Sequence, residues 1–202
     1  MINYYNYFLS LEKRFKKISN YVEVDERNSQ TFSTEILLTF LATCSEFEVV
    51  SKELCEIIFP GFKGKYPKAN IDNLVDIIIE HCPDIPSRTI ELEFFEKSLE
   101  PLKGWQRGKH PTWWKAYNKI KHDRSLNYHL ANLENLMLSL SALSLINHFF
   151  IWKTTCPKKT ISAASLYVGT LPSYFRIKNV QYEGPWSADD IFDKIENPGN
   201  KA

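Results

Sequence analysis

A long apolar segment in the second half of the chain constrains the fold most strongly. From about Asn132 to Trp152, apolar residues recur three and four positions apart, which gives a helix one continuous apolar face. The members of this face are Leu133, Leu136, Met137, Leu140, Leu143, Ile146 and Phe150. A helix with so much apolar surface needs other helices around it, so the pattern predicts the central helix of a bundle. Asn132 is a favourable N-cap and is expected to start this helix.

Four further segments have helical spacing, at residues 4–22, from a cap at Thr31 or Ser33 to about 58, at 71–82, and from 111–112 onward. Prolines or glycines follow the second and third segments, where a helix must stop. Only seven glycines occur in 202 residues, which argues against a many-stranded fold. The sequence therefore predicts an all-α fold, a four- to five-helix bundle.

Two regions lack this periodicity. Within residues 85–104, Ile90, Leu92 and Phe94 alternate as in a short strand, but no nearby segment offers a partner, so we expect an extended connection. The periodicity also ends after residue 155. We therefore expect a helical bundle at 1–155 and an irregular C-terminal extension at 156–202 that packs on the bundle. Within the extension, residues 174–180 are expected to form a short strand or loop, and 196–202 to be frayed.

Several classes of protein are excluded by what the chain lacks. The four cysteines are scattered and form no C-x-x-C pair, which predicts reduced core thiols in a cytoplasmic protein. The N-terminus lacks the order of a secretory signal, and no run approaches ~18 consecutive apolar residues, so no membrane segment is expected. The histidines lack the close spacing of zinc ligands, and no phosphate-binding loop, nucleophile elbow or dinucleotide fingerprint occurs. We therefore expect neither a metal nor a cofactor.

Positive charge is concentrated in residues 103–124. This window contains seven basic residues and one acid and so carries +6, and because the whole chain carries +1, the remainder carries −5. The basic residues are Lys103, Arg107, Lys109, Lys115, Lys119, Lys121 and Arg124. Such a band is a candidate site for a phosphate-bearing partner. The alternative is a solvated face whose charges balance acids elsewhere in the fold.

The helix that begins near 111–112 divides into two faces. At 100° per residue, Trp113, Tyr117 and Ile120 form an aromatic face that should pack inward, and Trp113 and Trp114 are expected to be core residues rather than a stacking platform for bases. The opposite face is polar and consists of Asn118, Lys121 and His122.

Arg124 does not fit this division, because it falls on the aromatic side. An arginine that points at a core is unfavourable unless it is paired or stacked. We therefore expect the helix to break near residues 125–131, so that Arg124 and His129 face each other across the bend.

The run from Arg124 to His129 matches the R-x(4–6)-H signature of the HEPN superfamily. The surrounding residues, Trp113-Trp114, Tyr117-Asn118 and Lys121-His122-Asp123, followed by an apolar helix, resemble those of a set of uncharacterised bacterial HEPN-like proteins. The resemblance extends over about residues 1–155, and its specific part is 113–143.

This resemblance implies a helical bundle that often forms a homodimer in which two Arg/His sets share one cleft. In catalytic members the reaction is RNA cleavage without a metal, so His129 would be the general base and Arg124 would stabilise the phosphate. Asn118, Lys121, His122 and Asp123 would support the site or hold the RNA or nucleotide. The implied biology is of the toxin or antiphage type, with an antitoxin-like protein as a possible partner.

The chain departs from the family pattern in two ways. Ser125 follows the arginine, where Asn or Asp is more usual, and His122 is a second histidine that makes the assignment of His129 ambiguous. Many HEPN proteins are not nucleases, so the same residues are also consistent with a hydrogen-bonded cluster that fixes the helix junction. The alternative function is a non-catalytic helical module that binds a nucleotide, a nucleic acid or a protein.

Overall fold

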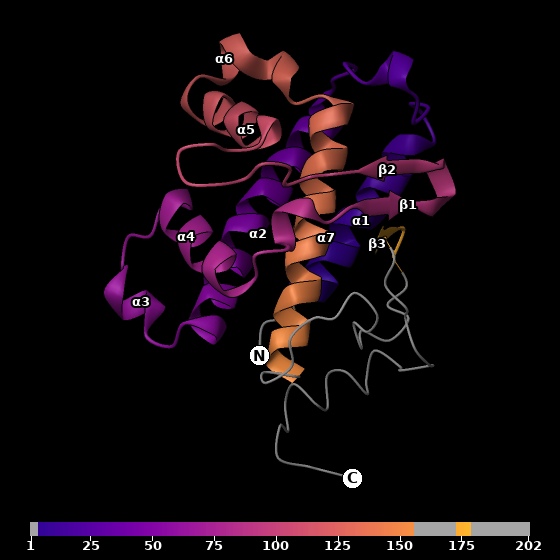
Figure 1. The fold of residues 1–202 in the computed structure, drawn as a ribbon. Coiled ribbons are helices and arrows are strands. Elements are labelled where there is room, and N and C mark those ends of the chain that lie inside the picture. The colour runs from indigo at the N-terminus through magenta and orange to yellow at the C-terminus, as the bar shows by residue number, and fades with distance from the viewer. Residues whose placement is uncertain (1–3, 156–172, 179–202) are drawn as a thin grey trace.

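The computed structural model describes residues 4–155 and 173–178, and within these ranges the chain is mostly helical with one small sheet (Figure 1). The α-helices are α1 (Tyr4–Ser19), α2 (Thr34–Ile58), α3 (Phe62–Lys65), α4 (Ile71–His81), α5 (Thr112–His122), α6 (Arg124–Asn127) and α7 (Leu133–Thr155). The strands are β1 (Ile90–Leu92), β2 (Lys97–Leu99) and β3 (Phe175–Ile177), in the order β2-β1-β3.

The five helices predicted from periodicity are present as α1, α2, α4, α5 and α7. Two of the predicted caps are confirmed. The Ser33 hydroxyl accepts a hydrogen bond from the Ile36 amide at 3.2 Å, and the Asn132 side chain accepts one from the Asn135 amide at 3.0 Å. Each cap satisfies an amide that has no partner within its own helix, which is why both helices begin where the sequence indicates.

Helix α7 lies at the centre of the fold, between α1 and α2 (Figure 1). The residues of its predicted apolar face are buried, apart from the half-buried Phe150. Helices α2 and α7 run in the same direction (Figure 1). Their first residues lie side by side, because the amides of Leu133 and Glu134 donate to the carbonyls of Thr31 and Ser29 at 2.9 and 3.0 Å. The start of α7 is therefore tied to the segment that leads into α2.

Among the described residues, one helix has the length and mean hydropathy of a membrane span, although the sequence contains no uninterrupted apolar run of that length. This helix is α7 over Leu133–Thr154, and 83% of its most apolar window is buried inside the fold. Such burial is typical of the core helix of a soluble protein.

The predicted core thiols are confirmed for the three described cysteines. Cys44, Cys55 and Cys82 are buried and form no disulfide. Burial raises the pKa of Cys55 to about 12 and that of Cys82 to about 11, so both thiols stay protonated and are poor nucleophiles. Cys156 lies outside the described residues.

The expectation of a strandless connection at 85–104 is wrong. Residues Ile90–Leu92 form β1, which pairs in antiparallel fashion with β2 on one side and β3 on the other. The alternating pattern is correct, since Ile90 and Leu92 are fully buried and Glu91 points outward. The partners were missed because β2 follows a tight turn with Glu96 at φ 50°, and β3 comes from the far end of the chain. The fold is thus mostly helical rather than all-α.

Strand β3 falls within the segment predicted to be a strand or loop, and it is firmly packed. Phe175 is fully buried, and its ring centroid lies 5.7 Å from that of Phe15 and 6.2 Å from that of Phe8 on α1. The Ser144 hydroxyl on α7 donates to the Phe175 carbonyl at 3.1 Å. Residues 156–172 and 179–202 of the predicted extension, including the frayed end at 196–202, lie outside the described residues.

A buried carboxylate anchors the residues before β3. Glu12 on α1 is only 4% exposed, and its Oε1 accepts hydrogen bonds from the Ser173 hydroxyl and the Tyr174 amide, both at 2.7 Å. Burial raises the pKa of Glu12 above its usual 4.5, and these hydrogen bonds oppose the rise. The stabilising contribution of Glu12 is therefore complete below pH 4.5 and is lost as the pH rises through the folded-state pKa.

Two substitutions of Glu12 are expected to have different effects on stability. Glu12→Gln keeps an Oε1 acceptor and removes the buried charge, so we expect unchanged or higher stability at pH 7 and a weaker dependence on pH. Glu12→Ala leaves two donors unsatisfied and is expected to lower the free energy of unfolding by about 1–3 kcal/mol. Urea unfolding of both variants and the wild type from pH 4 to 8 measures these effects. Equal losses in the two variants would contradict the role of Oε1.

Candidate functional site

The predicted break in the motif helix is present, but it comes earlier than expected. Helix α5 ends at His122, and Asp123 joins it to α6, a single turn that begins at Arg124. The Asp123 carboxylate accepts hydrogen bonds from the Leu126 amide at 3.2 Å and the Ser125 hydroxyl at 2.9 Å, which lower its pKa. The break falls at Asp123 because this side chain caps a new helical turn immediately.

Arg124 lines a groove between α2 and the α5–α6 segment. The groove has a cavity volume of about 520 Å³ and is lined by Leu41, Tyr117, Ile120, Lys121 and Arg124. Tyr117 and Ile120 are buried and Leu41 is half-buried, so the floor is apolar, while Lys121 and Arg124 are exposed. The Lys121 ammonium lies 5.6 Å from the centre of the Tyr117 ring. Helical phasing placed Arg124 on the side of Tyr117 and Ile120, and all three residues line this groove.

His129 lies outside the residues that line the groove. It is exposed and belongs to the short 3-10 turn Tyr128–Leu130 that follows α6. The turn is held by Tyr128, whose hydroxyl is 2.9 Å from that of Thr34 and whose ring centroid is 5.9 Å from that of Phe32. In the described part of the chain, no hydrogen bond joins Arg124 to His129.

The other predicted site residues have different surroundings. Asn118 is half-buried, and its side-chain amide donates to the Trp114 carbonyl one turn earlier at 3.1 Å, which supports α5 itself. His122 is exposed at the end of α5. Asp123 caps α6, and the Asn127 side chain donates to its carbonyl at 2.8 Å. The groove therefore brings together Lys121 and Arg124, whereas Asn118 supports α5 and Asp123 stabilises the helix junction.

The two tryptophans of the motif are core residues, as predicted. Trp113 and Trp114 are 1% and 4% exposed. The Trp113 indole donates to the Pro101 carbonyl at 2.9 Å, and its ring centroid lies 5.0 Å from that of Phe47 on α2. These contacts hold α5 against α2 and keep both rings away from a ligand.

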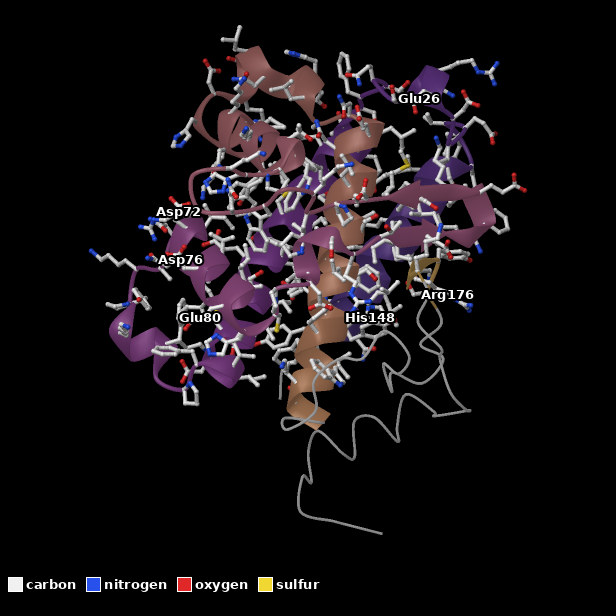
Figure 2. The ribbon with its side chains drawn as sticks, in the orientation of Figure 1. Glu26, Asp72, Asp76, Glu80, His148 and Arg176 are labelled. Atoms are coloured by element: carbon white, nitrogen blue, oxygen red, sulfur yellow. The ribbon has the colours of Figure 1, made fainter. Side chains whose placement is uncertain are left out.

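The cationic band separates into two parts. In its first half, Lys103 pairs with Glu100 at 2.8 Å, and Arg107 pairs with Asp76 on α4. The Gly108 amide donates to Asp72 at 2.9 Å. Figure 2 shows Asp72 and Asp76 on α4, beside the loop that leads into α5. The contacts of Arg107 and Gly108 fasten that loop to α4, so Arg107 has a structural role. Lys109, also in this half of the band, forms no ion pair within the described residues.

In the second half of the band, the charges have no counterions among the described residues. Lys115, Lys119, Lys121 and Arg124 are exposed, and none forms an ion pair within the described residues. The carboxylate that faces α5 from α2 is Glu48, which is paired with Lys52 at 2.6 Å. The carboxylate of Asp123, next to Arg124 in the sequence, accepts hydrogen bonds from Ser125 and Leu126 and forms no ion pair with these four cations within the described residues.

Sequence reasoning missed the contribution of Leu41 to the groove, because the spacing of Leu41 from Leu37 and Cys44 fits the buried stripe of α2. Leu41 lies at the edge of that stripe on the helix, and this position could have indicated that its side chain is only partly buried. Among the described residues, no group of three metal-ligating side chains comes together.

Comparisons with known proteins yield no relative: no family model, no curated protein and no solved structure matches the chain. The resemblance to the HEPN superfamily therefore rests on residues 113–143 of the sequence.

Proposed function

We propose that this chain is a HEPN-type protein, built on a four- to five-helix bundle, that cleaves RNA without a metal ion or a cofactor. The observation that supports this most directly is the position of Arg124. It is exposed, has no carboxylate partner within the described residues, and lines an apolar-floored groove together with Lys121. An unpaired arginine in a groove suits a phosphate, because its planar fork matches two phosphate oxygens.

In the proposed reaction, His129 accepts the proton of a ribose 2′-hydroxyl. The 2′-oxygen then forms a bond to the adjacent phosphorus, and the bond from phosphorus to the 5′-oxygen breaks. The leaving oxygen takes a proton from water, so the products carry a 2′,3′-cyclic phosphate and a 5′-hydroxyl. Arg124 stabilises the charge on the five-coordinate phosphate. Lys121 and His122 hold the neighbouring backbone, while Asn118 supports α5 and Asp123 keeps the helix junction in place.

A homodimer fits the separation of Arg124 and His129. In one protomer, Arg124 lines the groove and His129 does not, so a second copy that shares the cleft would supply the missing histidine. Three exposed apolar side chains lie on the segments around the groove, namely Phe32, Leu38 and Leu126, which are 50%, 48% and 72% exposed. Apolar surface of this kind favours a protein contact, with a second copy or with an antitoxin-like protein. We propose a cytoplasmic location for the assembly.

The proposal is tested by incubating the protein with end-labelled single-stranded RNA in EDTA. The matched substrate is DNA of the same sequence, which lacks the attacking 2′-hydroxyl. We expect RNA fragments that end in cyclic phosphate, and intact DNA. An Arg124→Ala/His129→Ala protein purified in the same way should leave the RNA intact. Equal cleavage by this double variant, or cleavage of the DNA, would overturn the proposal.

A second function, a non-catalytic module that binds RNA, a nucleotide or a protein, is favoured by one observation. The described lining of the groove contains two cations but no histidine. This function predicts RNA binding that weakens steeply with salt, because binding releases counterions, and no cleavage under any condition.

A further inference from the structure

The outer side of α5 carries cations that the groove does not use. Lys115, Lys119 and His122 are exposed and follow one another at steps of four and three residues, so they form one line along the helix. This line points away from the buried side of α5, which carries Trp113 and Tyr117. Helix α5 contains no acidic residue.

Within the described residues no carboxylate pairs with Lys115 or Lys119, and the same holds for some other exposed lysines, such as Lys13 and Lys17 on α1. What distinguishes Lys115 and Lys119 is their position on α5, the helix that also carries Lys121 of the groove. Both ammonium groups are available there to an external anion.

We propose that Lys115 and Lys119 form a second phosphate-binding line, so that one RNA strand is held both in the Arg124 groove and along the outer side of α5. This inference rests on the proposed function and assigns binding roles to two lysines outside the cleavage site. The helical rise of about 1.5 Å per residue separates the two lysines by about one turn along the axis, which allows each to contact a different phosphate. Such contacts fix the position of the strand and are independent of its sequence.

The polar character of the line favours RNA over a protein or a membrane as its partner. The line consists of Lys115, Lys119 and His122, and the half-buried Asn118 lies beside it, so no apolar side chain is among these residues. A protein interface normally has an apolar or aromatic centre, and a membrane-bound helix needs an apolar face. A phosphate backbone needs neither, because cations and hydrogen-bond donors are sufficient.

The experiment compares two double variants that remove the same charge. Lys115→Gln/Lys119→Gln removes the proposed line. Lys13→Gln/Lys17→Gln is the control, because these exposed lysines have the same spacing on α1, across the fold from α5 (Figure 1). Both are made in a His129→Ala background, and binding of a labelled 12-nucleotide RNA is measured by anisotropy from 50 to 300 mM salt.

We expect the α5 variant to weaken binding on the order of 10-fold and to reduce the salt slope by about 1.4, since each phosphate contact on a single strand contributes about 0.7. The α1 control should match the parent, and Lys115→Arg/Lys119→Arg should retain affinity, which separates loss of charge from loss of structure. If the α5 and α1 variants behave alike while the parent binds RNA, this inference is overturned and the proposed function stands. If the parent shows no salt-sensitive RNA binding, both are overturned.

Discussion

Replacing His129 with alanine is expected to slow RNA cleavage by about 100- to 10,000-fold, the usual contribution of a general base. RNA affinity should change little, because the His129 side chain is exposed and lies outside the groove that holds Arg124 and Lys121. Single-turnover cleavage and anisotropy, measured on the same preparation, separate the two effects.

Arg124 should behave differently, because it contacts the phosphate in both the ground state and the transition state. Arg124→Ala is expected to lower the cleavage rate by about 100- to 1,000-fold and also to weaken binding. Arg124→Lys keeps the charge but loses the planar fork, so binding should recover more than the rate does. A rate and an affinity that fall and recover together would point to a purely electrostatic role.

His122 is the matched control for the histidine assignment. It is exposed at the end of α5, seven residues before His129. Because His122 is assigned to holding the RNA backbone, we expect His122→Ala to bind RNA more weakly but to cleave the bound RNA at nearly the wild-type rate. If His122→Ala is inactive while His129→Ala retains activity, the general base has been assigned to the wrong histidine.

The helices could be predicted from the sequence, because the caps and the apolar spacing that define a helix lie within one short stretch of residues. The cap at Asn132 and the apolar spacing of α7 are both visible in one stretch of sequence, and the structure contains them at the expected positions. The break at Asp123 was also locally encoded. Aspartate is a favourable N-cap residue, and the Asp123 carboxylate accepts a hydrogen bond from the Leu126 amide three residues later. The cap predicted from the sequence was Asn132 instead.

Non-local pairing explains what could not be predicted. Ile90–Leu92 alternates visibly, but one of its partners is Phe175–Ile177, and no local pattern connects the two segments. In the same way, Arg107 was counted as a free cation because its partner, Asp76, lies 31 positions away on α4. A charge count along the chain therefore overestimated the number of unpaired cations, because Lys103 and Arg107 are both paired with carboxylates.

The largest expected effect on stability comes from a substitution in β3, the strand that pairs with β1 from far along the chain. Phe175→Ala should lower the free energy of unfolding by about 3–5 kcal/mol, because the ring is fully buried against Phe8 and Phe15 and its removal leaves a cavity between α1 and the sheet. Urea unfolding monitored by circular dichroism measures the loss. Hydrogen exchange should show reduced protection in α1 and β1, which contact β3 directly.

Phe94 is the matched control for this substitution. It is a phenylalanine near the same strands, its ring centroid lies 5.9 Å from that of Tyr174, and it is 71% exposed. Phe94→Ala should therefore change stability by no more than about 0.5 kcal/mol. If Phe175→Ala is equally mild, the strand at 175–177 does not belong to the folded core. If the loss is large, RNA cleavage below the unfolding temperature should still persist, because β3 lies well away from α5 and α6 (Figure 1).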